Sequence, residues 1–520
     1  MNKRLTGFFL LLLIGSLLLL GGKYLRTYMS DRNQRVTSDA AHTKGTIRVA
    51  VDSWIGYFPL CSSEMKAEMH RTGWLLECVD DKGDYQGRMA GLAEGKYEMV
   101  VATVDSYILN GKVHDYPGAI ITVLDESKGG DAIVARKDKV ANLDAIRSAG
   151  DLKVAFTPNS PSHYLLKAAA DHFDLPALLP VRKDLRLEME GSAKALAKLL
   201  AGTTDIAVLW EPDVSKALAE KTITKLLGTE ETERLIVDIL VAGRKYMQRQ
   251  PEAISQLLAA YFKVLKKFRD DPDLLQREVM TDTGVGKEAT KVMLKGVVWQ
   301  SLIDNCEKWF GIAGPGGKAE ERIIPTIDST VEILKDSGDF SESPIPGKDD
   351  YRLLKRSFLE ELYTSGVSGF TKARTGFGQD SGAPPAFPPL DAGGWAALSE
   401  VGTLKLKPII FQHGSAELDL LADVELDSAA ERLSHYPNFR IIIKGHTGTR
   451  GDTQENQLLS QRRAEGVAEY LRTKHGIDAG RLHAEGFGGS KPLPQNSGES
   501  LRAYEQRLLR VELILVREDL

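Results

Sequence analysis

The stretch from Phe439 to Lys474 constrains the fold most, because its hydrophobic period changes across a short polar turn. Residues 439–443 form an apolar run with the composition of a strand, and residues 458–474 have the spacing of a helix. The turn between them, residues 444–452, is rich in Gly, Thr and Asp, which is typical of a loop before a helix start. The stretch therefore predicts a strand, an exposed loop and a helix, in that order.

The length and composition are those of an ordinary globular protein. Its 520 residues suffice for roughly three domains. With 42% hydrophobic and 27% charged residues it can bury a core, and a net charge of −5 argues against a nucleic-acid partner. Three cysteines exclude a disulfide framework but leave open one bridge, between Cys61 and Cys78, in an oxidising compartment.

The amino end carries an apolar run over residues 5–22, flanked by basic residues. A run of about 18 residues can span a membrane, whereas signal-peptide cores have about 7–15. Because no small-residue cleavage site or lipid-accepting cysteine follows, we interpret residues 1–26 as an uncleaved signal-anchor in the inner membrane; a cleaved signal peptide is the alternative. Both predict a periplasmic location for the rest of the chain, in a Gram-negative type of envelope. Residues 27–44 read as a polar spacer.

Strand and helix patterns alternate from residue 45 to about 340, which predicts an α/β domain with largely parallel sheets. Ser160 followed by Pro161 is a helix-start signal. The helix patterns fall at 87–94 and 251–270. The strand patterns fall at 46–51, 75–79, 98–103, 119–125, 131–135, 152–156, 205–210 and 235–243.

This order resembles the two-lobed solute-binding proteins of ABC importers, of the nitrate, taurine and thiamine-precursor type. The matching segments are 54–59, 92–99, 125–131, 205–212 and 245–253. The resemblance implies a periplasmic-binding-protein fold, a small-molecule solute as ligand and an ABC permease as a further partner.

Ligands of open α/β sheets bind beyond the carboxyl ends of strands. The candidates there are Asp52, Ser53, Trp54, Tyr57, Thr103, Asp105, Ser127, Ser160, Ser162, Trp210 and Glu211. The helix start near Ser160 would suit an anion, but acidic groups beside Trp54 and Trp210 favour a cationic or polar neutral solute. Simpler interpretations stay open: Trp54 and Tyr57 as hinge packing, Ser160 as a helix cap, and the whole domain as a sensor or docking surface.

The chain lacks recognisable catalytic patterns. It has no phosphate-binding glycine loop, no histidines at metal-ligand spacing and no Gly-x-Ser-x-Gly turn. The sequence therefore predicts no enzyme activity, no cofactor and no metal site.

Residues 341–400 predict a connection between domains. Residues 349–363 have the apolar spacing of a helix that could close the preceding domain. Residues 376–394 are rich in Gly and Pro, as in a semi-extended spacer.

Residues 402–520 predict a smaller α/β domain. Residues 404–406 and 409–411 are expected to form one strand, and residues 420–435 a helix, before the stretch described first. The domain resembles OmpA-like peptidoglycan-binding domains. The matching segments are 411–416, 445–447, 459–464, 467–471 and 486–488, with Asn456.

The resemblance implies a peptidoglycan site. In that family, an Asp directly after Gly-His-Thr and an Arg before Ala grip the diaminopimelate of the peptide stem, and arginine suits its carboxylate. Here Arg463 keeps the arginine place and Asn456 the polar place, near Thr447, but the place of the acid is Gly448. Asp452, in the same loop, is the hypothetical replacement.

Together these patterns predict a cell-envelope protein that couples a solute-binding or sensing module to peptidoglycan. The alternative is the binding component of an ABC importer for a small cationic or polar solute, with a degenerate OmpA-like domain.

Overall fold

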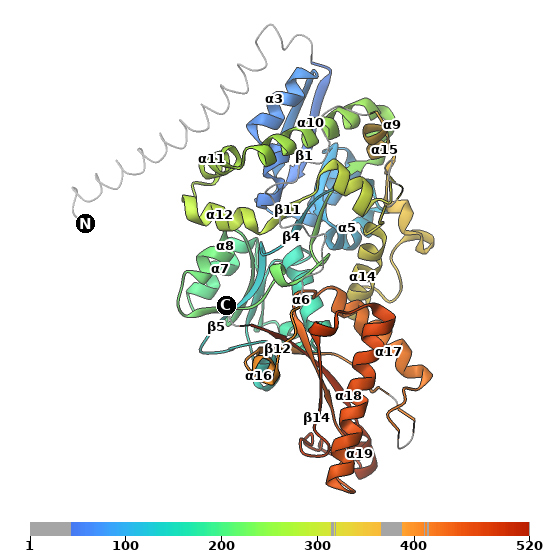
Figure 1. Ribbon diagram of the computed structural model, residues 1–520. Helices are drawn as coiled ribbons and strands as arrows, with labels where there is room; N and C mark the ends of the chain where they lie inside the picture. The colour runs from blue at the N-terminus through green and yellow to red at the C-terminus, as the bar shows by residue number, and fades with distance from the viewer. Residues whose placement is uncertain are drawn as a thin grey trace, which may run out of the picture.

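The computed structural model describes residues 43–313, 317, 319–365, 387–409, 411–412 and 415–518. They form two α/β lobes and a C-terminal domain, which follow one another from top to bottom in Figure 1. The predicted anchor over 1–26, all but the end of the 27–44 spacer, and residues 376–386 of the Gly- and Pro-rich segment lie outside the described residues. Within those ranges, no helix combines the length and apolarity that crossing a membrane requires.

Lobe 1 is built on a sheet with the strand order β11-β4-β10-β3-β1-β2. Its strands are β1 (Gly45–Val51), β2 (Trp74–Asp80), β3 (Met99–Thr103), β4 (Gly118–Ser127), β10 (Val237–Gly243) and β11 (Val297–Trp299). Its main helices are α2 (Phe58–Cys61), α3 (Ser63–Arg71), α4 (Tyr85–Glu94), α5 (Val104–Gly111), α9 (Arg244–Arg249), α10 (Pro251–Asp270), α11 (Pro272–Thr283), α12 (Lys287–Lys295), α13 (Leu302–Asp304), α14 (Ile323–Asp336) and α15 (Ser357–Thr364). β3 and β4 are buried along their whole length, so the core of the lobe lies on both faces of this sheet.

Lobe 2 is a smaller sheet with the order β7-β6-β8-β5-β9. Its strands are β5 (Asp131–Arg136), β6 (Val154–Phe156), β7 (Arg186–Glu188), β8 (Ile206–Trp210) and β9 (Ile223–Gly228), and its helices are α6 (Pro161–His172), α7 (Ser192–Leu200) and α8 (Asp213–Leu218). The chain enters the lobe between β4 and β5 and leaves it between β9 and β10. The second crossing, residues 229–236, is called the linking segment below.

The two lobe sheets are mixed, and the prediction of largely parallel sheets is wrong. β1 pairs in parallel with β2 and β3, as β6 does with β7 and β8. However, β10 runs antiparallel to β3 and β4, and β5 runs antiparallel to β8 and β9. These antiparallel strands flank the two crossings between lobes, where the chain enters a sheet from the opposite end. An apolar run in the sequence does not reveal whether its strand pairs in parallel or antiparallel.

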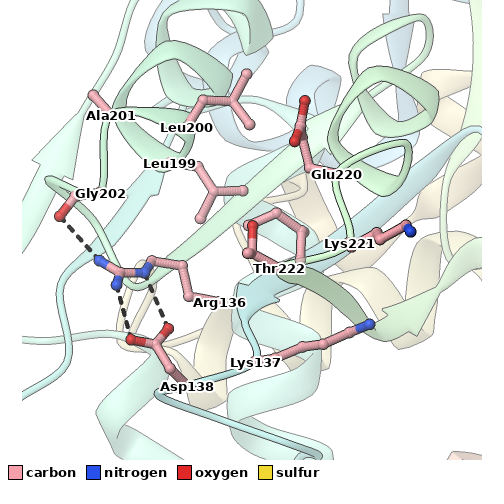
Figure 2. A pocket seen from close by; sticks show the side chains of 11 residues that line it. Arg136, Lys137, Asp138, Leu199, Leu200, Ala201, Gly202, Glu220, Lys221 and Thr222 are labelled. Atoms are coloured by element: carbon pink, nitrogen blue, oxygen red, sulfur yellow. Dashed lines mark hydrogen bonds and ion pairs between the residues drawn. The ribbon is translucent and has the colours of Figure 1, made fainter.

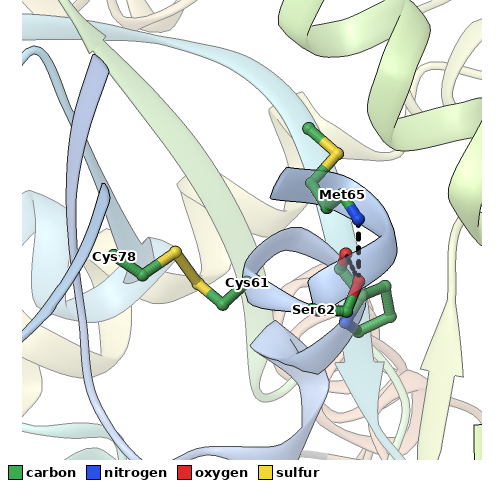
Figure 3. Close-up of a disulfide and its surroundings, with 5 residues drawn as sticks. Cys61, Ser62, Met65 and Cys78 are labelled. Atoms are coloured by element: carbon green, nitrogen blue, oxygen red, sulfur yellow. Dashed lines mark hydrogen bonds between the residues drawn. A yellow bond between two sulfur atoms is a disulfide. The ribbon is translucent and has the colours of Figure 1, made fainter. Parts of the chain in front are cut away.

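Cys61 and Cys78 form the disulfide that the sequence left open, with 5.9 Å between their Cα atoms (Figure 3). The bond joins the end of α2 to β2. It therefore fixes one end of the loop that carries Trp54 and Tyr57.

The C-terminal domain has four strands in the order β12-β15-β13-β14. Its elements are α16 (Ala392–Ala396), β12 (Ser399–Leu404), α17 (Leu420–Ser434), β13 (Arg440–Gly445), α18 (Thr453–His475), β14 (Leu482–Gly486), α19 (Leu501–Leu508) and β15 (Val511–Arg517). The predicted strand, loop and helix around residue 445 are confirmed. The helix begins earlier than predicted, at Thr453, because the Asp452 side chain caps it, and Gly476 ends it at φ +66°.

Two sequence predictions near this domain are wrong. Its first strand is 399–404 and not 404–411, because residues 399–404 pair with β15, whereas Phe411 forms only an isolated bridge with Leu418. The single helix predicted over 349–363 is a short 3₁₀ turn (Asp350–Leu353) followed by α15. Leu354 interrupts it by forming a bridge with Ile120 beside β4.

The C-terminal domain packs against lobe 2 and the linking segment (Figure 1). On lobe 2, the hydroxyl of Tyr436 lies 2.8 Å from Nδ1 of His172. On the linking segment, the backbone N–H of Glu233 donates to the carbonyl of His435 at 2.8 Å, and the Asn438 amide donates to the carbonyl of Glu230 at 2.9 Å. Arg517 also forms an ion pair with Glu231. The domain thus holds the segment through which the chain returns to lobe 1.

Candidate functional site

A cavity lies between the lobes, where the strand ends of lobe 1 face β5, β8 and the start of α6. Ten residues line it: Asp52, Trp54, Tyr57, Tyr85, Thr103, Asp131, Pro161, Trp210, Ile236 and Asp238. Its free volume of about 10 Å³ accommodates about one water molecule, so the lobes are closed on each other.

Asp52 enters the cavity from the end of β1 and is held by three donors. It accepts hydrogen bonds from the backbone N–H of Trp54 at 2.9 Å, the Tyr85 hydroxyl at 3.0 Å and the Arg88 guanidinium at 3.1 Å. Arg88 is fully buried and also pairs with Asp81 at 2.5 Å. One buried cation is therefore shared by two carboxylates.

Asp125 and Asp238 face each other across the antiparallel pair β4 and β10. The indole N–H of Trp54 donates to Asp125 at 3.1 Å, and the hydroxyl of Tyr57 donates to Asp238. Burial raises the pKa of Asp125 to about 8. The pKa of Asp238 is also raised, first by burial and then by the charge of Asp125. Neither carboxyl has a basic side chain beside it in the described structure, so the pair resists carrying two negative charges.

Asp131 and Asp105 add two more buried carboxyls, one from each lobe. Burial raises the pKa of each to about 7, and the charge of Asp105 contributes to the shift of Asp131. Oδ1 of Asp105 and Oγ1 of Thr157 are buried with no hydrogen-bond partner among the described residues. Buried polar atoms normally have partners, but neither Thr157 nor Asp105, which was predicted as a ligand residue, lines the cavity.

Several predicted ligand residues lie outside the cavity and serve the loops around it. Ser53 is exposed and lines a neighbouring hollow next to the disulfide, which shares Asp52, Trp54 and Tyr57 with the cavity. The hydroxyl of Ser127 bonds that of Thr229 at 2.8 Å, and Glu211 accepts from the Ser215 hydroxyl at 2.6 Å. At the start of α6, Ser160 donates to the carbonyl of Thr157 at 2.6 Å, and Ser162 accepts from the N–H of Thr157 at 3.1 Å.

Other predicted residues do line the cavity: Asp52, Trp54, Tyr57, Thr103 and Trp210. The sequence analysis missed Tyr85, Asp131, Pro161, Ile236 and Asp238 as lining residues. Asp238 had a usable signal, because it is a lone acid in the apolar strand pattern of 235–243. The position of Tyr85 at the start of α4 gave no such signal.

A larger hollow, of about 740 Å³, lies at the outer edge of lobe 2, between the end of α7 and β9 (Figure 2). There Arg136 pairs with Asp138 at 2.8 Å and donates to the carbonyl of Gly202 at 3.2 Å. Since its arginine is already paired and the hollow is formed by one lobe alone, the cavity between the lobes is the better candidate for a solute.

The second candidate site surrounds the start of α18. The Arg463 Nε donates to the carbonyl of Ser415 at 3.1 Å, and its guanidinium lies 4.8 Å from the centre of the Phe411 ring. The side chain is mostly buried, and burial lowers its pKa. The structure therefore holds this arginine in one place while leaving its charge without a carboxylate partner in the described part of the chain.

The polar residues of this loop are also engaged locally. Oδ1 of Asp452 accepts the N–H groups of Gln454 and Glu455 at 2.8 and 2.9 Å, as a helix cap does. The Asn456 amide donates to the carbonyl of Arg450 at 2.9 Å, and the Thr447 hydroxyl to that of Gly448 at 3.3 Å. A Cβ at Gly448 would meet only Leu509 Cδ2, at 4.0 Å, so a side chain fits there.

Residues 410–506 match the model of the OmpA family, so this part of the chain is an OmpA-family domain. Outer membrane porin F of Pseudomonas aeruginosa is 31% identical over 124 residues, which cover 24% of this chain and 35% of the porin. The peptidoglycan-associated lipoprotein of Buchnera aphidicola is 34% identical over 99 residues, covering 19% of this chain and 57% of the lipoprotein. The chain thus spans about a third of the porin and just over half of the lipoprotein.

Solved structures overlay on a larger part of the chain at low identity. The alkanesulfonate-binding protein SsuA of Xanthomonas axonopodis pv. citri, bound to MOPS, has a TM-score of 0.46 and 12% identity, covering 60% of this chain and 99% of SsuA. The desulfurization enzyme DSZB has a TM-score of 0.41 and 10% identity, covering 62% and 99%. The two-lobed fold of residues 43–365 is assigned from its own strand order and its two crossings.

Proposed function

We propose that this chain is a cell-envelope protein in which a two-lobed module binds or senses a small solute and is coupled to peptidoglycan by the OmpA-family domain. The role assigned is binding and not catalysis. Two relatives of the C-terminal domain are named peptidoglycan-associated lipoproteins, which supports the wall as its partner.

The packing of the C-terminal domain on the linking segment carries this proposal. Glu230, Glu231 and Glu233 of that segment all contact the domain. Two-lobed modules open and close by rotation about the segments that join their lobes. A domain fixed to lobe 2 and to one such segment is therefore placed to link cleft opening to wall attachment.

The proposal places the protein in the inner membrane by a single span over residues 5–22, with the lobes and the OmpA-family domain in the periplasm. Arg463, Thr447 and Asn456 would contact the peptide stem, with Asp452 supplying a carboxylate from the helix cap. An ABC permease in the same membrane is a further partner of the solute module.

Sedimentation of the full chain with purified peptidoglycan tests the wall contact. Wild type is expected to co-sediment, and Arg463→Lys to lose most of this binding, because lysine keeps the charge but lacks the bidentate fork. Arg462→Lys is the matched control, since Arg462 is the exposed neighbour on the same helix. Equal binding by both variants would remove Arg463 from the site.

One observation favours the alternative function. Gly448 stands where the related domains have their acid, so the grip on the stem is incomplete. If wild type fails to co-sediment while the lobes still bind a solute, the chain is better described as the binding component of an importer with a degenerate OmpA-like domain.

A further inference from the structure

We infer that the solute of the cavity between the lobes is a small organic ammonium ion, held by carboxylates from both lobes. This inference rests on the proposed function, since it takes the cavity as the solute site and names the class of solute. It depends on the charges and the aromatic walls of that cavity.

Of the ten described residues that line the cavity, three are acidic and none is basic. Its three carboxyls are Asp52 and Asp238 from lobe 1 and Asp131 from lobe 2. Asp52 shares the buried Arg88 with Asp81, so this group of three keeps a negative charge. A cation placed between the lobes would therefore complete ion pairs on both sides, whereas an anion would be repelled from both.

The walls suit an alkylammonium ion. Trp54 from lobe 1 and Trp210 from lobe 2 line the cavity with the phenol rings of Tyr57 and Tyr85. The indole of Trp54 is fixed in place by its hydrogen bond to Asp125. Aromatic faces attract ammonium groups within about 6 Å of the ring centre, more strongly when water is excluded.

Two unpartnered buried atoms belong to residues that do not line the cavity but stand close in sequence to Thr103 and Pro161, which do. Oδ1 of Asp105 in lobe 1 and Oγ1 of Thr157 in lobe 2 have no partner in the described residues, and both side chains are 3% exposed. Thr103, which lines the cavity, accepts the N–H of Ser106 at the start of the same helix as Asp105. A water molecule that bridges such an acceptor to an ammonium group in the cavity would satisfy it.

The start of α6 does not turn the cavity into an anion site. The residue that lines the cavity there is Pro161, which has no N–H to offer. The neighbouring Ser162 uses its hydroxyl to accept from the N–H of Thr157. The helix start thus presents few free donors to the solute.

The free volume of the closed cavity limits the solute's size and requires the lobes to separate before it enters. About 10 Å³ is less than an alkylammonium ion occupies. The lobes therefore open slightly to admit the solute, and the bound solute remains in contact with both lobes.

The experiment is a calorimetric and thermal-shift titration of the full chain with matched probes. Choline and ethanolamine are the ammonium probes; 3,3-dimethylbutan-1-ol is the neutral isostere of choline, and isethionate is the anionic counterpart of ethanolamine. At least one ammonium probe is expected to bind and raise Tm, with the isostere and isethionate at least about tenfold weaker.

Variants then place the binding in the cavity. Asp131→Asn and Asp238→Asn, one in each lobe, are each expected to weaken ammonium binding at least about tenfold, because each variant loses a charge-assisted hydrogen bond. Asp138→Asn removes an exposed lobe-2 carboxylate far from the cavity and is expected to leave affinity unchanged. Unaltered far-UV spectra and Tm in each variant confirm that it is folded.

The other outcomes overturn the inference. If the isostere or isethionate binds, and Trp54→Ala and Trp210→Ala abolish that binding, the cavity is the solute site but the solute is not an ammonium ion. If Ca²⁺ alone binds through Asp131 and Asp238, the site takes a metal. If no probe binds, the ammonium class is rejected, and sedimentation with peptidoglycan still decides the wall-binding part of the proposed function separately.

Discussion

The cavity between the lobes and the loop at the start of α18 differ in how their charges are compensated. The cavity gathers carboxyls from both lobes, and in the described part of the chain only Arg88, which Asp52 shares with Asp81, forms an ion pair with one of them. The loop holds Arg463 in a fixed position but has Gly448 where the resemblance to OmpA-like domains implies an acid. One site therefore lacks a cation and the other lacks an anion.

This difference shows what each site needs from its ligand. A charge that is buried without a partner costs several kcal/mol, and a ligand of opposite charge recovers part of that cost. Asp131 and Asp238 of the cavity can lower this cost by taking up protons, as their raised pKa values indicate. Arg463 cannot lose its proton, so a carboxylate from the peptide stem or from a mutation has to provide the partner.

The largest effect on stability is expected from removing Arg88, the buried cation beneath the cavity. Arg88→Leu leaves Asp52 and Asp81 buried without a counter-charge, so the free energy of unfolding should fall by about 3–5 kcal/mol. Urea denaturation followed by circular dichroism measures this change. Arg71→Leu, which removes an arginine with 69% side-chain exposure, is the control and should change stability by less than about 1 kcal/mol.

A rescue separates charge from packing in this variant. Adding Asp52→Asn and Asp81→Asn to Arg88→Leu removes the stranded charges and should recover much of the lost stability. If the triple variant is no more stable than Arg88→Leu, the loss came from packing, and the cavity acids are not compensated in the way described.

A smaller effect is expected from pH. The pKa of Asp125 is about 8 in the folded chain against an ordinary 3.8, so the folded state binds more protons than the unfolded state between these values. Stability from this carboxyl is present at low pH and is lost as pH rises through about 8, by at most about 1.4 kcal/mol per pH unit. Tm without solute should therefore fall from about pH 5 to about pH 8, and Asp125→Asn should flatten that slope. A Tm that rises over this range would contradict the assignment.

The smallest effect is expected at the wall site. Gly448→Asp supplies the missing acid in a space where a Cβ meets only Leu509, at 4.0 Å. It should strengthen co-sedimentation with peptidoglycan by about fivefold, or about 1 kcal/mol. Gly448→Asn, of the same size but uncharged, is the control. Equal binding by both variants would mean that the loop does not lack an acid.

The protein also shows which parts of the fold could be predicted from the sequence. The strand, loop and helix around residue 445 were predictable because the hydrophobic period changes there and Asp452 and Gly476 mark the helix ends. The mixed sheets were not, because β5 and β10 have apolar runs that carry no information on direction. The helix predicted over 349–363 failed because Leu354 finds a distant partner, Ile120, which its neighbours in sequence do not reveal.

Only part of the cavity lining could be predicted, because contacts between distant segments also decide which residues line it. Trp54, Tyr57 and Trp210 follow strand ends, where ligands of α/β sheets gather, and they line it as expected. Ser127, Ser160 and Glu211 follow strand ends too, but neighbouring groups take up their hydrogen bonds. Asp238 joins Asp125 only through the pairing of β4 with β10, a register that the sequence does not specify.

Proton release on binding tests the central claim most directly. The full chain is titrated with ethanolamine at about pH 7 in phosphate and in HEPES, which differ in ionisation enthalpy. If the ammonium group pairs with Asp131 and Asp238, binding favours their ionised forms and releases protons, so the observed enthalpy will differ between the two buffers. Binding with the same enthalpy in both buffers, or with proton uptake, would contradict a carboxylate site for an ammonium ion.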